Sequence, residues 1–248
     1  MKAPDTILPL ELRNVSFEVG GTTLIRNISC RFEAGLRTCI VGPNGAGKSL
    51  LLRLCHGLIT PTHGDIQWHG FTNGDVRARQ AMVFQRPVML RRTVNANVDY
   101  ALKIRGITPS KRRARVAEVL ERTGLAHLSK RPARVLSVGE QQRLALARVW
   151  ALKPQILFLD EPTASLDPAG THAVEGLIDA IHQDGARIVM TTHDLGQARR
   201  IADDVLFMHR GEVRAFEAAE SFFDHPTDPL AAAFIRGELL WWDQNTQP

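Results

Sequence analysis

The feature of this sequence that most constrains its fold is an apolar run that leads directly into a glycine-rich segment. Residues 38–41, Thr-Cys-Ile-Val, favour a β-strand, and a short apolar run of this kind is typical of a buried parallel strand. Residues 42–49 follow as Gly-Pro-Asn-Gly-Ala-Gly-Lys-Ser, and Leu50, Leu51 and Leu54 then begin a helical apolar stripe. The order strand, glycine-rich loop and helix predicts a unit of an α/β fold.

The same loop fits the phosphate-binding pattern G-x-x-x-x-G-K-[ST]. Its glycines let backbone N–H groups curl around a phosphate, Lys48 brings a positive charge to the outer phosphates, and Ser49 offers a hydroxyl to Mg²⁺. A glycine-rich turn that matches by accident is expected in about one per cent of chains of this length. The predicted nucleotide-binding residues are Gly42, Pro43, Asn44, Gly45, Ala46, Gly47, Lys48, Ser49 and Leu50.

The size and composition are those of an ordinary globular protein. The 248 residues are 44% hydrophobic and 23% charged, enough for one large domain or two small ones. No apolar stretch approaches the ~18 residues of a membrane span, and no signal-peptide run precedes Glu11. Three cysteines without a C-x-x-C pattern predict reduced core thiols in a cytosolic protein. The net charge of +5 requires no nucleic-acid partner.

The N-terminal part predicts a small antiparallel sheet. Leu10–Val19 alternates apolar and polar residues with one phase slip, as in a half-buried strand. After the Gly20-Gly21 turn, a second strand carries Ile28, Cys30 and Phe32, and Ile66 and Trp68 indicate a third. Residues 60–64 between these elements read as a loop.

The segment from 88 to 137 has a helical texture. A strand over residues 81–85 is followed by Pro87, which excludes a continuing helix. Helical spacing then begins at Val94, and Thr108-Pro109-Ser110 opens another helix with Ala114, Ala117 and Leu120 on its apolar side. Its basic residues are expected on a solvated face, since no aromatics accompany them as in nucleic-acid binding. These residues are Lys111, Arg112, Arg113 and Arg115.

From residue 137 onward, strands and helices alternate. Ser137 and Glu140 form a capping box before a long apolar-periodic helix. Buried strands are predicted at residues 156–159, 188–190 and 205–208, with a helix between the first two. The fold class is therefore α/β with a mainly parallel sheet, an N-terminal antiparallel β subdomain and an inserted helical subdomain. We expect one domain: a core of 1–87 and 138–225, the helical subdomain 88–137 and a tail 226–248.

Polar side chains follow three of these strands: Gln85, the pair Asp160-Glu161, and His193. Ligands in open α/β sheets bind at the carboxyl ends of strands, so all are expected to converge on the loop at 42–49. Asp160 is placed to hold Mg²⁺ through water, Ser49 to bind it directly, and Gln85 to bind either Mg²⁺ or the attacking water. Glu161 is a candidate base for an attacking water, and His193 a contact to the γ-phosphate. Taken singly, each is equally well explained as a satisfied polar residue at a strand end.

Together these motifs resemble the ATP-binding cassette ATPases along essentially the whole chain. They occur in the family's order: the P-loop, Gln85, the signature Leu-Ser-Val-Gly-Glu at 136–140, the strand ending in Asp160-Glu161, the loop Ser165-Leu166-Asp167, and His193. The resemblance implies ATP hydrolysis with Mg²⁺ by a head-to-tail pair of copies. Ser137, Gly139 and Glu140 of one copy would then cap the nucleotide on the other's P-loop, and Asp167 would lie at the dimer seam.

The chain departs from the family pattern in two places. The usual signature is Leu-Ser-Gly-Gly-Gln, and here Val138 and Glu140 replace a glycine and the glutamine. Val19 occupies the position where the family stacks an aromatic ring on adenine, although Phe17 is an alternative. Since Val19 cannot stack, we predict weak discrimination between ATP and GTP.

A single cassette of this kind resembles the separate ATPase subunit of a bacterial importer. The region 83–106 is similar to cassettes of oxyanion importers, tungstate types especially. The implied partners are integral membrane permease subunits and, indirectly, a solute-binding protein, with the chain at the cytoplasmic face of the cell membrane. Candidate residues of the permease groove are Val88, Met89, Leu90 and Tyr100, with a core role equally open.

The alternatives are a soluble mechanical ATPase acting on nucleic acid or ribosomes, and a GTPase or small-molecule kinase. The first lacks support because residues 88–137 carry no sustained heptads and the chain has only one cassette. The second leaves the signature and His193 without a role. No nucleic-acid partner is expected, and Trp241-Trp242 is interpreted as part of a packed tail.

Overall fold

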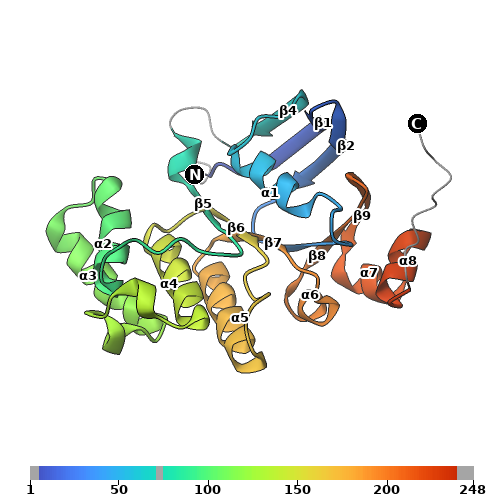
Figure 1. Ribbon diagram of the computed structural model, residues 1–248. Coiled ribbons are helices and arrows are strands. Elements are labelled where there is room, and N and C mark those ends of the chain that lie inside the picture. Colours follow the sequence, from blue (N-terminus) through green and yellow to red (C-terminus); the bar gives the residue numbers. More distant parts are fainter. Residues whose placement is uncertain (1–5, 71–74, 239–248) are drawn as a thin grey trace, which may run out of the picture.

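Two sheets and the helices around them build the molecule (Figure 1). The structure is a computed structural model and describes residues 6–70 and 75–238. The larger sheet has the strand order β5-β6-β7-β3-β8-β9, and the smaller has the order β2-β1-β4. The larger sheet comprises β3 (Arg37–Val41), β5 (Gln80–Val83), β6 (Ile156–Asp160), β7 (Arg187–Thr191), β8 (Asp204–His209) and β9 (Glu212–Ala218).

Five strands of the larger sheet run parallel. β3 pairs with β7 on one side and β8 on the other, and β6 lies between β5 and β7. Only β9, at one edge, is antiparallel to its neighbour β8. The predicted α/β fold with a mainly parallel sheet is therefore confirmed, and the parallel strands bring their carboxyl ends to one edge.

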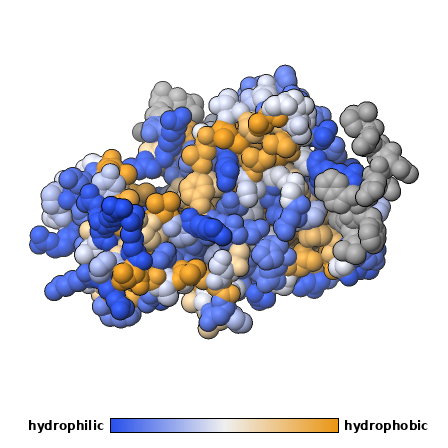
Figure 2. Space-filling view, in the orientation of Figure 1, coloured by the Kyte–Doolittle hydropathy of each residue, from blue (hydrophilic) through white to orange (hydrophobic). Residues whose placement is uncertain are grey.

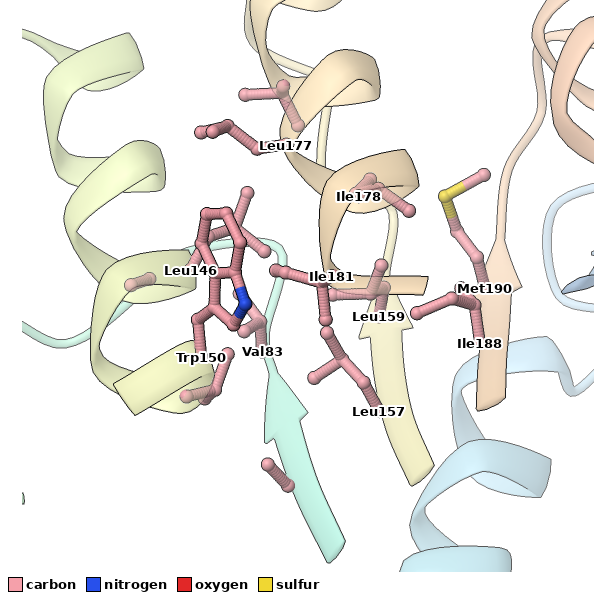
Figure 3. Packing of buried hydrophobic residues seen from close by; sticks show 14 of the residues in the cluster. Val83, Leu146, Trp150, Leu157, Leu159, Leu177, Ile178, Ile181, Ile188 and Met190 are labelled. Atoms are coloured by element: carbon pink, nitrogen blue, oxygen red, sulfur yellow. The ribbon is translucent and has the colours of Figure 1, made fainter. Parts of the chain in front are cut away.

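Helices and the small sheet cover opposite faces of the larger sheet. One face packs against α4 (Val138–Ala151), α5 (Pro168–Gln183) and α6 (Leu195–Ile201), and the other against α1 (Lys48–His56) and the small sheet. Successive residues of β6 alternate between these layers: Leu157 and Leu159 join the first core, and Ile156 and Phe158 the second. Figure 3 shows the first core, where Trp150 of α4 packs beside Ile181 of α5.

The small antiparallel sheet confirms the N-terminal prediction. It consists of β1 (Leu10–Val19), β2 (Thr22–Phe32) and β4 (His63–Trp68), so β4 begins inside the segment expected to be a loop. β1 carries register irregularities after Leu12, after Val15 and after Phe17, and these account for the phase slip in its alternation.

The segment between β5 and α4 holds α2 (Val94–Ile104) and α3 (Pro109–Arg122), with short 3₁₀ turns at Ala126–Leu128 and Ala133–Val135. A further 3₁₀ turn, Val76–Ala78, precedes β5. The prediction of both helices is confirmed, and the boundaries at 88 and 137 remain predictions. The inner side of α3 was wrongly expected to carry Ala114 and Ala117, which are exposed. Val116, Val119 and Leu120 are its buried residues.

Two of the four basic residues of α3 are not on a solvated face. Arg112 donates from Nε to Asp99 Oδ1 of α2 at 2.7 Å. Arg115 donates to the carbonyls of Trp150 at 2.6 Å and Ala151 at 3.3 Å, at the end of α4. Lys111 and Arg113 are exposed as expected. The cluster is thus partly used to hold α3 against α2 and α4.

The C-terminal part adds elements that were not predicted: the edge strand β9, α7 (Ala219–Asp224) and α8 (Pro229–Ile235). Phe222 of α7 packs against Phe207 of β8, with ring centroids 6.2 Å apart. Residues Trp241 and Trp242 lie outside the described residues. Within 6–70 and 75–238, no helix is both long and apolar enough to cross a membrane.

Candidate functional site

The glycine-rich loop connects the end of β3 to the start of α1, as predicted. Gly47 is the N-cap of α1, with φ of 100° and no side chain capping the first turn. The N–H groups at that helix end are therefore available to an anion. Gly45 also has positive φ, 80°, in the exposed part of the loop. The loop is shaped as a phosphate cradle whose left-handed positions are occupied by glycine.

A pocket of about 260 Å³ opens beside this loop and is lined by Asn44, Gly45, Ala46, Gly47, Lys48, Ser49, Leu50 and Glu161. Lys48 is largely buried, and its Nζ donates to the carbonyls of Gly42 at 2.8 Å and Pro43 at 3.1 Å. Burial lowers the pKa of Lys48, and the nearby carboxylates of Glu161 and Asp160 oppose that shift. The lysine thus brings a positive charge to the floor of the loop.

Two hydroxyl groups and one carboxylate meet where α1 approaches β6. Ser49 Oγ donates to Asp160 Oδ1 at 2.7 Å, and Thr191 Oγ1 donates to the same carboxylate oxygen at 2.9 Å. A hydroxyl beside a carboxylate is the hard-oxygen chemistry that Mg²⁺ prefers, so these residues fit such an ion. Among the described residues, no three His, Cys, Asp or Glu side chains form a metal cluster of their own. A metal here would therefore also need oxygens from its ligand or from water.

Glu161 lies between the two other predicted strand-end residues. Its Oε2 accepts from Gln85 Nε2 at 3.3 Å and lies 3.3 Å from His193 Nδ1. Its backbone adopts φ of 43°, an uncommon value for a residue with a side chain. The N–H of Glu161 donates to Thr191 Oγ1 at 2.9 Å, which fixes the backbone from which the carboxylate extends. β5 ends at Val83, so Gln85 lies two residues beyond the strand rather than on it.

Thr191 is the site residue that sequence reasoning missed. It faces Asp160 in the β6–β7 register and bonds both Asp160 and the Glu161 backbone. A polar residue ending an apolar strand, two residues before His193, was the available signal.

The residues of the predicted signature lie at the N-terminus of α4. Ser137 Oγ accepts from the Glu140 N–H at 3.3 Å, and the Glu140 carboxylate accepts from the Ser137 N–H at 2.8 Å. The capping box is thus confirmed, and the Ser137 N–H lowers the pKa of Glu140. Gly139 lies in the same turn, near Leu166 of the loop after β6. None of these three residues lines the pocket at the P-loop of the same chain.

Other predicted residues lie at the margins. Val19 is 55% exposed at the end of β1 and is not among the residues that line the P-loop pocket. Of the candidate permease contacts, Val88 and Tyr100 are exposed. Met89 is 6% exposed and belongs to the buried core cluster that also includes residues of α2 and α4.

This geometry defines a class of protein: a P-loop nucleotide-binding α/β protein with acidic and polar strand ends beside its phosphate loop. The family model described as ABC transporter matches residues 25–164. The tungstate uptake system ATP-binding protein TupC of Peptoclostridium acidaminophilum is 38% identical, over 87% of this chain and 100% of that protein. The phosphate import ATP-binding protein PstB 2 of Natronomonas pharaonis is 36% identical, over 94% and 88%.

A solved structure gives the same result. That of cbiO1 from Clostridium perfringens, part of the ABC transporter complex cbiONQ, superposes with a TM-score of 0.79 and 29% identity over 87% of this chain and 90% of that one. The chain belongs to the ABC transporter family, as an ATP-binding subunit of the import type and therefore an ATPase coupled to transport.

Proposed function

We propose that this chain hydrolyses ATP to ADP and phosphate with Glu161 as the group that orients or deprotonates the attacking water. The carrying observation is the position of Glu161 at the P-loop pocket, with Gln85 and His193 each 3.3 Å from its Oε2. A carboxylate so placed accepts a proton from water, and the two neighbours restrict its orientation. His193 contacts the γ-phosphate in this proposal.

The remaining loop residues bind and orient the nucleotide. Lys48 turns from the carbonyls of Gly42 and Pro43 to the outer phosphates, whose charge stabilises the ammonium against burial. Ser49, Asp160 and Gln85 would hold Mg²⁺, with Asp160 acting through water. When bound, Mg²⁺ neutralises phosphate charge as it develops.

Substitution of Glu161 tests its proposed role in activating water. Glu161→Gln should keep ATP affinity and lower turnover at least about a hundredfold, because the amide cannot accept the proton. Glu121→Gln, on the exposed side of α3, is the matched control and should leave turnover unchanged. Turnover of Glu161→Gln within a few-fold of wild type would remove Glu161 from this role.

Lys48→Ala should weaken nucleotide binding itself, which equilibrium binding measures.

The site is completed by a second copy of the chain in this proposal. The supporting observation is that Ser137, Gly139 and Glu140 line no part of the P-loop pocket of their own chain, although α4 presents them at an exposed helix N-terminus. In a head-to-tail dimer this end of α4 would face the partner's γ-phosphate, with the Ser137 hydroxyl and the Gly139 N–H as donors. Hydrolysis would then separate the two copies.

Mixing two inactive variants tests this arrangement. Lys48→Ala damages the P-loop half and Ser137→Ala the signature half, so a mixed dimer has one site with both defects and one intact site. Random pairing of equal amounts makes about half of the dimers mixed, which predicts about a quarter of wild-type turnover. No recovery on mixing, with both variants folded and dimeric, would contradict the head-to-tail site.

We further propose that the chain energises uptake of an oxyanion, with tungstate as the leading candidate, at the cytoplasmic face of the membrane. Support comes from the transport systems to which the two relatives belong: tungstate uptake and phosphate import are both oxyanion transport. The permease contact would use the exposed apolar side chains Val88 and Tyr100. Figure 2 shows apolar side chains at the surface of the helical segment on the side viewed there.

Affinity purification from detergent-solubilised membranes should recover permease subunits with the chain, and deleting its gene should abolish uptake of one labelled oxyanion. Tungstate, phosphate and sulfate are the probes, with a cationic solute as control. Recovery of ribosomes or nucleic acid instead would favour the soluble mechanical ATPase, which is disfavoured because Arg112 and Arg115 of the basic cluster are engaged in contacts.

A further inference from the structure

A buried amide in α6 joins the two segments that carry Glu161 and His193. Gln197 is fully buried. Its Nε2 donates to Thr163 Oγ1 at 2.9 Å and to Glu175 Oε1 at 3.0 Å, and the Thr163 hydroxyl is 3.2 Å from Gln197 Oε1. One side chain therefore connects the loop after β6, helix α5 and helix α6.

Each end of this connection is close in sequence to a site residue. Thr163 follows Glu161 by two residues, and the intervening turn is closed by the Ala164 N–H donating to the Glu161 carbonyl at 3.3 Å. Gln197 follows His193 by four residues, and its N–H donates to Asp194 Oδ1 at 3.0 Å. A shift of Thr163 relative to Gln197 would thus alter the 3.3 Å separation of Glu161 and His193.

The orientation of the amide is fixed by a carboxylate. Glu175 of α5 has a side chain 11% exposed and is paired with Arg200, whose Nη2 lies 2.8 Å from Oε1. That hydrogen bond raises the pKa of Arg200. Because an ionised carboxylate only accepts, the group that faces it from Gln197 must be the NH₂. A glutamate at 197 lacks that donor unless it is protonated.

A small polar cavity lies beside Thr163, on one side of this contact. A pocket of about 190 Å³ lies between the two segments, lined by Glu161, Thr163, Ala164, Leu166, Thr171, Thr192, His193 and Asp194. This pocket leaves the loop after β6 room to move. The hydrogen bonds between Gln197 and Thr163 oppose such movement.

We propose that Gln197 is a positioning residue of the ATPase: through Thr163 it fixes the spacing between the carboxylate of Glu161 and the ring of His193. The proposal rests on the roles assigned above to these two residues. It assigns Gln197 no contact with nucleotide, so its loss should change kcat and leave the KM for ATP and the nucleotide affinity unchanged.

Substitution of Gln197 gives the first test. Gln197→Met keeps the length and removes both hydrogen-bonding groups, and kcat should fall about tenfold or more, since small misplacements near the chemistry are costly. Gln197→Glu should be equally slow at pH 8, and its kcat relative to wild type should recover as the pH falls and the carboxyl becomes a donor. Gln197→Met should show no such recovery. The matched control is Gln183, an exposed glutamine whose Nε2 donates to Asp179 at 2.7 Å; Gln183→Met should leave kcat unchanged.

Substitution of Thr163 gives the second test and does not depend on the buried position. Thr163→Val should lower kcat as Gln197→Met does, whereas Thr163→Ser, which keeps the hydroxyl, should have the kcat of wild type. The kcat of the double variant Thr163→Val/Gln197→Met should be no lower than that of either single variant. A kcat within twofold of wild type for Thr163→Val, or additive losses in the double variant, would overturn the proposal. If Glu161→Gln itself turns over normally, the proposed function fails instead, whereas an inactive Glu161→Gln beside a fully active Thr163→Val refutes only the role of Gln197.

Discussion

Gly42 offers the sharpest structural prediction because two glycines of one loop differ in what surrounds them. A Cβ built at Gly42 would lie 2.1 Å from the carbonyl oxygen of Met208, at φ of 147°. A Cβ at Gly45, at φ of 80°, would meet nothing within 4 Å. Both positions disfavour a side chain through φ, and only Gly42 adds a collision with backbone.

The difference can be worked from these contacts. Positive φ costs about 1–3 kcal/mol for alanine at either position, and a clash that must move backbone adds about 1–3 kcal/mol at Gly42. Gly42→Ala should therefore be less stable than Gly45→Ala by about 2 kcal/mol. For a chain of this length that corresponds to a Tm about 4–8 °C lower.

Urea unfolding and calorimetry of both variants without nucleotide measure this difference directly. Gly42→Ala should also bind ATP more weakly, because the Gly42 carbonyl that would shift accepts from Lys48. Equal stability of the two variants would refute the reasoning, since it would mean that β8 yields to the added methyl group at no cost.

Three further predictions concern other parts of the chain. Because Val19 cannot stack on a base, GTP should compete with ATP within about tenfold, and a hundredfold rejection of GTP in competition binding would contradict this. Burial raises the pKa of the Cys30 and Cys39 thiols to about 12, so the stability that they contribute is complete below about pH 9 and is lost as the pH rises toward 12. Urea unfolding at pH 8 and 10.5 should show the loss, and Cys39→Val should reduce it. Arg187 is fully buried 3.8 Å from Asp204, so Arg187→Met should cost about 3–5 kcal/mol by denaturant unfolding, and Arg187→Met/Asp204→Leu should regain most of it.

Much of the fold could be predicted because its signals are local. The apolar runs of β3, β6 and β7 are strands buried on both faces, and each shows that burial in its own sequence. The helices α2 and α4 begin at a threonine and a serine whose side chains cap them, which is also readable from a few residues. Strand β9 lies at the sheet edge with its residues exposed or half-buried, so it lacks the continuous apolar run that marks the buried strands.

The errors came from contacts between distant residues. Arg112 and Arg115 were predicted to be solvated, because the helical spacing of α3 carries no information about their partners in α2 and at the end of α4. For Met89 the sequence left a groove role and a core role equally open, and only its burial in the cluster shared with α2 and α4 favours the core role. The link from Gln197 to Thr163 spans 34 residues and has no local pattern at all.

The candidate site shows why convergence was predictable and its inner contacts were not. Parallel strands place their carboxyl ends together whatever the loops do, so Asp160 and Glu161 had to lie near the P-loop once β3 and β6 shared a sheet. Which hydroxyl bonds which oxygen depends on register, and a slip of one residue would move Thr191 away from Asp160. The register of β6 against β7 thus holds the Asp160 carboxylate and the Glu161 backbone through one threonine. Ser137, at the start of α4, belongs to no such sheet register and lines no part of this pocket, so its proposed role at the phosphates depends on the proposed second copy of the chain.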